Sequence, residues 1–146
     1  MIEFSASDRD KLFQSQIPPG TALWFHDYKF PDGTIKDKYI VILNQNHENN
    51  SYFLLTTSQI KPLHKSRPKR YLIIKSGCVD FFPKDTAIDT FTIADCPFAK
   101  LRKKCIKSNP SVKRVGKLPS YIMDKIYLMI KDSDEISTAK KKIVLK

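Results

Sequence analysis

The sequence is short of several residues on which common folds and sites depend. Its 146 residues include four glycines and one tryptophan, and no glycine-rich phosphate loop is present. A nucleotide-binding α/β fold is therefore not expected, because that fold places such a loop at a strand–helix turn. His-x-x-x-His pairs, Gly-x-Ser-x-Gly elbows and paired-carboxylate motifs are also missing, so these catalytic signatures are excluded.

Cysteine is scarce as well. The three cysteines, Cys78, Cys96 and Cys105, are odd in number and form no C-x-x-C pair. This count argues against a disulfide scaffold and a cysteine-based zinc site, and it fits a reducing, cytoplasmic compartment. The three histidines lie far apart along the chain, so neither a metal site nor a cofactor is expected.

Long apolar runs are missing, and acidic residues are few. No stretch has the length of a signal-peptide core or a membrane span, so a soluble protein without a membrane partner is expected. Lys and Arg total 26 against 15 Asp and Glu, which gives a net charge of +11. That excess favours a polyanionic partner, nucleic acid first and an acidic protein second, over a charge that serves solubility alone.

The chain does have short apolar runs separated by turn residues. Between Gly20 and Gln59, three such runs are rich in β-branched and aromatic residues, a pattern typical of a strand meander. The expected strands are Thr21–His26, Lys38–Leu43, Tyr52–Leu55, Arg70–Ile74, Asp89–Ala94 and Lys113–Gly116. The unbroken run of Lys38–Leu43 predicts burial on both faces.

One helix follows the strands. Ile122, Ile126 and Ile130 recur at helical spacing and predict a helix over Ser120–Lys131 that faces the core. The fold expected from these patterns is mainly β, a small bent antiparallel sheet or barrel capped by the C-terminal helix. Residues 1–18 are expected to form an extension, either a short helix or a frayed terminus, residues 19–132 the domain, and residues 133–146 a loose basic tail.

Polar groups at the ends of the expected strands suit metal-independent cleavage of RNA. In that reaction the 2′-hydroxyl attacks the adjacent phosphorus, so the site needs proton carriers, a cation and small hydrogen-bond donors. Lys36 or Lys38 can supply the cation, and Thr57 and Ser58 the donors. The candidates for proton transfer are His26 and Asp95. Each has an ordinary structural alternative, such as a solvated lysine, turn chemistry or a half-buried histidine.

Basic segments and aromatic residues add candidate contacts to RNA. The segments 61–70 and 100–107 are lysine- and arginine-rich and suit the phosphate backbone, while aromatic side chains can stack on unpaired bases. The expected RNA-binding residues are Lys36, Tyr28, Tyr39, Lys61, Lys65, Arg67, Lys69 and Arg70.

The order of these features resembles the MazF/PemK-like toxins of bacterial type II toxin–antitoxin systems, over roughly Pro19–Lys131. The resemblance rests on order and spacing, because each motif is short. The matching features are the glycine-containing entry into Gly20–Phe25, the basic Lys38 before an apolar strand, the Thr56-Thr57-Ser58 strand end, the strand ending at Asp95, and the segment Arg114–Leu118 before the terminal helix.

The resemblance implies an SH3-like barrel of five to seven strands, often a homodimer, that is a sequence-specific, metal-independent endoribonuclease acting on single-stranded RNA. It also implies an acidic antitoxin that covers the RNA groove. The family roles at the scissile phosphate map to Lys38 and to Thr57, with Ser58 adjacent.

Three positions depart from the family pattern. Lys38 stands in place of an arginine and lacks the planar fork that grips a phosphate. Tyr39 stands where a proline is usual, and Ile93 where some relatives carry an arginine. A non-catalytic barrel that binds nucleic acid or a protein is the alternative hypothesis, and a purely protein-binding module is a third.

Overall fold

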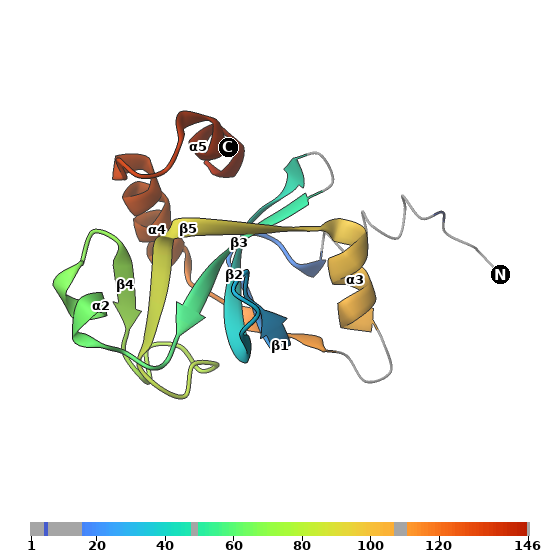
Figure 1. Cartoon of the computed structure of the whole chain (residues 1–146), viewed down its shortest axis with the longest axis horizontal. Helices are drawn as coiled ribbons and strands as arrows, with labels where there is room; N and C mark the ends of the chain where they lie inside the picture. Colours follow the sequence, from blue (N-terminus) through green and yellow to red (C-terminus); the bar gives the residue numbers. More distant parts are fainter. Residues whose placement is uncertain (1–4, 6–15, 48–49, 107–110, 146) are drawn as a thin grey trace.

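A computed structural model describes residues 5, 16–47, 50–106 and 111–145 of the chain. In this part of the chain, six antiparallel strands form one curled half-barrel sheet with the order β4-β5-β3-β2-β1-β6 (Figure 1). The fold is therefore mainly β, as predicted, with short helices around the sheet and helices at the C-terminal end of the chain. The strands are β1 (Thr21–Lys29), β2 (Ile35–His47), β3 (Asn50–Thr57), β4 (Tyr71–Ile74), β5 (Thr86–Pro97) and β6 (Val112–Lys117), and the helices are α2 (Pro62–Ser66), α3 (Phe98–Ile106), α4 (Ser120–Asp132) and α5 (Thr138–Val144).

The first hairpin is tighter than the sequence predicts. β1 continues to Lys29 and β2 begins at Ile35, so the loop expected over residues 27–37 is only a short turn. The Asp32 carboxylate accepts a 2.8 Å hydrogen bond from the Thr34 N–H, and Gly33 has a φ of 90°. Glycine adopts this left-handed conformation without a steric penalty, so the turn closes within a few residues and the strands lengthen.

Two other strand limits were predicted wrongly. The polar loop expected over residues 44–51 is largely strand, since β2 reaches His47 and β3 begins at Asn50; residues 48–49 lie outside the described part. The sequence predicts that the fifth strand ends at Ala94, but β5 continues through Asp95 to Pro97. Pairing with β3 holds these polar residues in the sheet. Since β4, in the described part of the chain, pairs only with residues 86–89 of β5, Pro97 lies at an edge of the sheet, where a proline is tolerated.

The basic segment after β5 forms α3, a helix that the sequence did not reveal. Leu101 is fully buried and Cys105, one turn later, is half-buried, while Lys100 and Lys103 are exposed. Two inward positions are too few to give a recognisable helical period. The sequence therefore indicates only a basic segment here.

The expectation of a loose basic tail was wrong for most of residues 133–146. Ser137 caps α5 by accepting a 3.1 Å hydrogen bond from the Lys140 N–H. Ile136 and Val144 are buried. These apolar contacts dock the segment against the rest of the domain and override its local charge.

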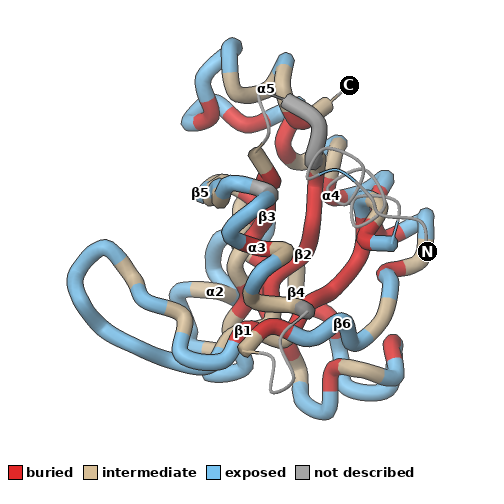
Figure 2. The backbone as a smooth tube through the Cα atoms, turned by 90° about the vertical axis from the view of Figure 1, so that its right-hand side faces the viewer, coloured by how far each residue is buried: buried red, intermediate tan, exposed pale blue. Residues whose placement is uncertain are grey.

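The sheet is buried on both faces, as predicted for β2. Val41 and Leu43 join a core that includes α4 and α5, while Ile40 and Ile42 join a second core with α3. All four residues are 1% exposed or less. This alternation follows from the period of two along a strand, and Figure 2 shows the buried positions concentrated along β2 and β3.

The sequence also makes predictions for the C-terminal helix and for the N-terminal extension. α4 buries Ile122, Ile126 and Ile130, which confirms the predicted core-facing helix. The predicted extension over residues 1–18 lies mostly outside the described residues, although Ile17 is buried in the second core. None of the helices in the described part is long and apolar enough to cross a membrane.

Candidate active site

A groove of about 540 Å³ lies where the ends of β1, β2 and β3 meet the start of β5. We call it the strand-end groove. Its lining residues come from four separate stretches of the chain, so only the folded sheet brings them together. They are Trp24, Lys36, Asp37, Lys38, Tyr39, Thr56, Thr57, Ser58, Gln59, Pro83, Lys84 and Thr86.

Lys38 and Thr57 lie near each other at the ends of adjacent strands. Ile40 pairs with Leu55 on the neighbouring strand, and Lys38 and Thr57 each lie two positions beyond this pair. The two residues that the family resemblance singles out therefore line the same groove from adjacent strands.

The ends of these strands are fixed by Thr56. Its side chain is buried, and its hydroxyl donates a 2.8 Å hydrogen bond to the Tyr39 carbonyl. Thr57 is half-exposed, and its Oγ1 accepts a 3.2 Å bond from the Gln59 N–H. Because that bond uses a lone pair of the oxygen, the hydroxyl hydrogen of Thr57 remains available to donate into the groove. Ser58 is exposed beside it and offers a second hydroxyl.

Lysines dominate the charge of the groove. Lys38 is half-buried, and this burial, together with the nearby charge of Lys36, lowers the pKa of its ammonium group. Lys84 lines the opposite side, next to the start of β5. Three cations face a single lining carboxylate, Asp37, so the groove attracts an anion.

Aromatic rings form part of the same lining. Trp24 pairs with Tyr39 across β1 and β2, and their ring centroids lie 4.7 Å apart. Tyr39 also contacts Phe82, with centroids 5.2 Å apart. Tyr39 is among the residues predicted from the sequence, whereas Trp24 is not, because only strand register brings it to the groove. Rings beside lysines suit a ligand that has both a base and a phosphate.

His26 lies beside the groove and contacts two carboxylates. Its Nδ1 is 2.7 Å from Asp37 Oδ1, and its Nε2 is 3.3 Å from Asp27 Oδ2. Asp37 Oδ1 also accepts a 2.9 Å bond from the Asp27 N–H, and this bond, then the proximity of His26, lowers the pKa of Asp37. Asp37 thus anchors the imidazole at the edge of the groove. Neither aspartate was identified from the sequence.

The same three side chains could hold a metal ion. Their ligand atoms lie within 4.8 Å of one another, and all three residues are exposed. In the structure, Asp37 contacts Nδ1 and Asp27 contacts Nε2, so the two carboxylates hold the imidazole ring from both nitrogens.

Asp95, the other candidate for proton transfer, does not line the strand-end groove. It pairs with Tyr52, whereas the groove residue Thr57 pairs with Ala87. Tyr52 and Thr57 are five positions apart on β3, or about 17 Å at the usual rise of a strand. Asp95 instead lies near Tyr28, whose pKa is raised by burial first and then by Cys96 and Asp95.

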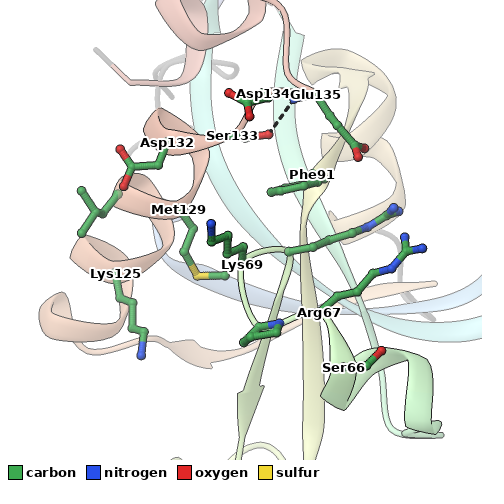
Figure 3. Close-up of a pocket in the computed structure, with 13 residues that line it drawn as sticks. Ser66, Arg67, Lys69, Phe91, Lys125, Met129, Asp132, Ser133, Asp134 and Glu135 are labelled. Atoms are coloured by element: carbon green, nitrogen blue, oxygen red, sulfur yellow. Dashed lines mark hydrogen bonds between the residues drawn. The ribbon is translucent and has the colours of Figure 1, made fainter.

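A second groove, of about 740 Å³, lies between α4 and the segment that joins α2 to β4 (Figure 3). Arg67 and Lys69 line one side, whereas carboxylates from α4 and the following segment line the other, with Phe91 and Met129 between them. Those carboxylates offset the positive charge that would attract a nucleic-acid backbone. The acidic lining residues are Asp132, Asp134 and Glu135.

Arg70, another lining residue of the second groove, is already paired. Its Nε and Nη2 each lie 3.1 Å from an oxygen of Asp89, and the guanidinium carbon is 5.1 Å from the centroid of the Tyr71 ring. This geometry gives Arg70 a structural role in joining β4 to β5. Lys61 and Lys65, at α2, are exposed and line neither groove.

Comparisons with known proteins do not assign the site. No known protein family and no curated protein sequence matches the chain. The chemistry of the two grooves is therefore argued from their own residues.

Proposed function

We propose that the protein is a toxin-like endoribonuclease that cleaves single-stranded RNA in the strand-end groove without a metal ion. The observation that carries the proposal is the meeting of Lys38 and Thr57, from adjacent strands, in a lysine-lined groove with aromatic rings. A ribonucleotide offers the matching features, namely a phosphate for the lysines and a base for Trp24 or Tyr39.

The proposed reaction is an internal transesterification. The RNA 2′-oxygen forms a bond to phosphorus while the bond from phosphorus to the 5′-oxygen breaks. The products are a 2′,3′-cyclic phosphate and a 5′-hydroxyl. One proton leaves the 2′-hydroxyl, and one is delivered to the 5′-oxygen.

Each lining group has a place in this scheme. Asp37 accepts a hydrogen bond from the Nδ1–H of His26, so Nε2, which lies 3.3 Å from Asp27 in the structure, takes the 2′ proton once the ribose replaces that carboxylate. Water protonates the departing 5′-oxygen, and His26 then releases its proton to the solvent. Lys38 and Lys36 stabilise the negative charge on the phosphate oxygens. Thr57 and Ser58 donate hydrogen bonds to the same oxygens.

The wider account follows the MazF/PemK-like resemblance. It comprises an SH3-like barrel, assembly as a homodimer, cytoplasmic location and an acidic antitoxin. The order of strands and helices supports it, as does the net charge of +11, since an acidic protein would be attracted to the basic surface.

A non-catalytic RNA-binding barrel is the second candidate, and Lys38 is the observation that favours it. A lysine at this position supplies charge but not the bidentate grip of an arginine. In that case the groove binds single-stranded RNA and leaves it intact.

The test is the rate of cleavage of mixed-sequence single-stranded RNA in EDTA. Thr57→Val removes the hydroxyl and retains the branched shape, so we expect the rate to fall about 100- to 1000-fold. Lys38→Ala should have a comparable effect. Lys131→Ala, an exposed lysine on α4, is the matched control and should retain the wild-type rate.

Two results would overturn the proposal. RNA of many sequences that stays intact with folded protein would leave only the binding function. Cleavage that requires added Mg²⁺ or Mn²⁺ would instead implicate His26, Asp27 and Asp37 as metal ligands.

A further inference from the structure

A continuous series of cation–aromatic contacts leads away from the strand-end groove. Lys38 Nζ lies 5.8 Å from the centroid of the Phe30 ring. The Phe30 and Tyr28 centroids are 5.1 Å apart, and those of Tyr28 and Phe25 are also 5.1 Å apart. Lys104 Nζ lies 5.5 Å from the centroid of Phe25. We call these five residues the cation–aromatic ladder, and it joins the first hairpin to α3.

The ladder is only partly required by packing. Phe25 is 7% exposed and belongs to the second core, so it serves the fold. Tyr28 packs against the same core but, like Phe30, is half-exposed near the hairpin turn. Aromatic faces left partly open to solvent beside ammonium groups are the feature that single-stranded nucleic-acid sites share.

Helix α3 extends the positive charge beyond the ladder. Lys100 and Lys103 are exposed on it. The charges of Lys100 and Lys104 also reach the thiol of Cys96, where they oppose the rise in its pKa that burial causes. Since the charge of Asp95 acts on Tyr28, this end of β5 lies beside the aromatic part of the ladder.

Charge separates this surface from the second groove. The charge of Asp95 acts on Tyr28 of the ladder, whereas Lys38, Lys100 and Lys104 supply positive charge around it. In the second groove three carboxylates balance Arg67, Lys69 and Lys125, and the fourth cation, Arg70, is paired with Asp89. A polyanion is therefore favoured on the ladder and not in the larger cavity.

We propose that the ladder and the exposed lysines of α3 bind the part of a single-stranded RNA that extends beyond the strand-end groove. Bases stack on Tyr28 and Phe30, and phosphates contact Lys100, Lys103 and Lys104. Lys38 belongs to both surfaces, because it lines the groove and also faces Phe30. The inference rests on the proposed function only in taking the groove as the place of cleavage.

The test compares the binding of short and long RNA in the Thr57→Val background, where cleavage is suppressed. Fluorescence anisotropy with oligouridines of about 4 and about 12 nucleotides separates a ligand that fills one site from one that spans both surfaces. Tyr28→Leu with Phe30→Leu removes the stacking faces and keeps apolar packing. We expect this double variant to bind the long RNA about tenfold or more weakly, and the short RNA within about twofold of the parent.

A second pair of variants tests the lysines and leaves the aromatic side chains unchanged. Lys100→Gln with Lys104→Gln removes two charges, so the slope of log affinity against log salt should fall by about 1.4, or about 0.7 for each phosphate contact. Lys125→Gln with Lys131→Gln removes the same charge from exposed positions on α4 and should leave the slope unchanged.

The outcomes for the ladder and for cleavage are distinguishable. Loss of long-RNA binding in both ladder variants supports the inference even if the wild-type protein cleaves nothing. Wild-type affinity for long RNA in both variants, or equal losses in the α4 control, would overturn the inference. Cleavage of RNA that persists in that case would leave the proposed function standing.

Discussion

Breaking the pair between Arg70 and Asp89 should destabilise the protein without weakening RNA binding by the folded form. Asp89 accepts two hydrogen bonds from the guanidinium and one, at 3.0 Å, from the Phe91 N–H. The two charged side chains are 24% and 20% exposed. Arg70→Met preserves much of the aliphatic length but leaves the carboxylate with the Phe91 bond alone.

The geometry sets the size of the effect. Removing one partner of a fully buried pair costs about 3–5 kcal/mol, because an uncompensated charge remains in the interior. Here, solvent reaches about a fifth of each side chain and replaces part of the lost interaction, so we expect a loss of about 2–3 kcal/mol in the free energy of unfolding. For a domain near this size, that corresponds to a fall of about 5–10 °C in Tm.

A double-mutant cycle in urea measures the coupling between the two residues. Asp89→Asn retains an oxygen for the Phe91 N–H, so the cycle isolates the ion pair, and we expect a coupling of about 1–2 kcal/mol. The pair of Lys75 and Asp85 is the matched control. Its atoms lie 3.6 Å apart, its side chains are 71% and 45% exposed, and Lys75→Met should cost less than about 1 kcal/mol. Equal effects at both pairs, or a coupling near zero, would refute the reasoning.

Three further predictions follow from other contacts. A Cβ at Gly116 would lie 2.2 Å from Phe81 Cδ1, so Gly116→Ala should lower the free energy of unfolding by about 1–3 kcal/mol in urea, and adding Phe81→Leu should recover most of the loss; an unchanged stability would contradict that contact. Burial raises the pKa of Cys105 to about 11, so at pH 8 iodoacetamide should modify the exposed Cys78 well before Cys105, as peptide mass mapping would show; equal labelling would count against the buried thiol. Burial lowers the pKa of Lys38, so its contribution to RNA affinity should decline as the pH rises, at a lower pH than the value of about 10.4 for an ordinary lysine; Lys38→Arg should abolish this decline, and an identical pH profile would contradict it.

Much of the sheet could be predicted from the sequence because short apolar runs form the middle of its central strands. Lys38–Leu43 and Tyr52–Leu55 both lie within observed strands, and the helix expected from Ser120 differs at its end by one residue. These segments have their signal in side chains that the core selects, so period and composition are sufficient.

The limits of a strand or helix could not be predicted in this way where contacts with distant segments decide them. Residues 95–97 and 44–47 look like turns by composition, but pairing with β3 holds both segments as strands. Helix α3 was hidden for the related reason that one fully buried residue, Leu101, anchors it. Tertiary context overrode local propensity in each case.

Some residues of the candidate site could be predicted from the sequence, and others could not. Lys36, Lys38, Tyr39, Thr57 and Ser58 lie together because they flank the ends of strands that the sequence already indicated. The site members that were missed needed register or turn geometry. Trp24 reaches the groove through its pairing with Tyr39, and Asp37 contacts His26 across the hairpin. Conversely, an arginine can bind RNA and an aspartate can transfer a proton, but the fold places Arg70 and Asp95 away from the strand-end groove.

The most direct measurement of the central claim is the identity of the ends that the purified protein leaves on single-stranded RNA in EDTA. Mass analysis of the fragments is predicted to show 2′,3′-cyclic phosphates and 5′-hydroxyls, and these products should disappear with Thr57→Val and with a 2′-deoxy nucleotide at the scissile position. Unbroken RNA, or fragments with a 5′-phosphate, would contradict the assignment of the strand-end groove as a ribonuclease site that uses the 2′-hydroxyl.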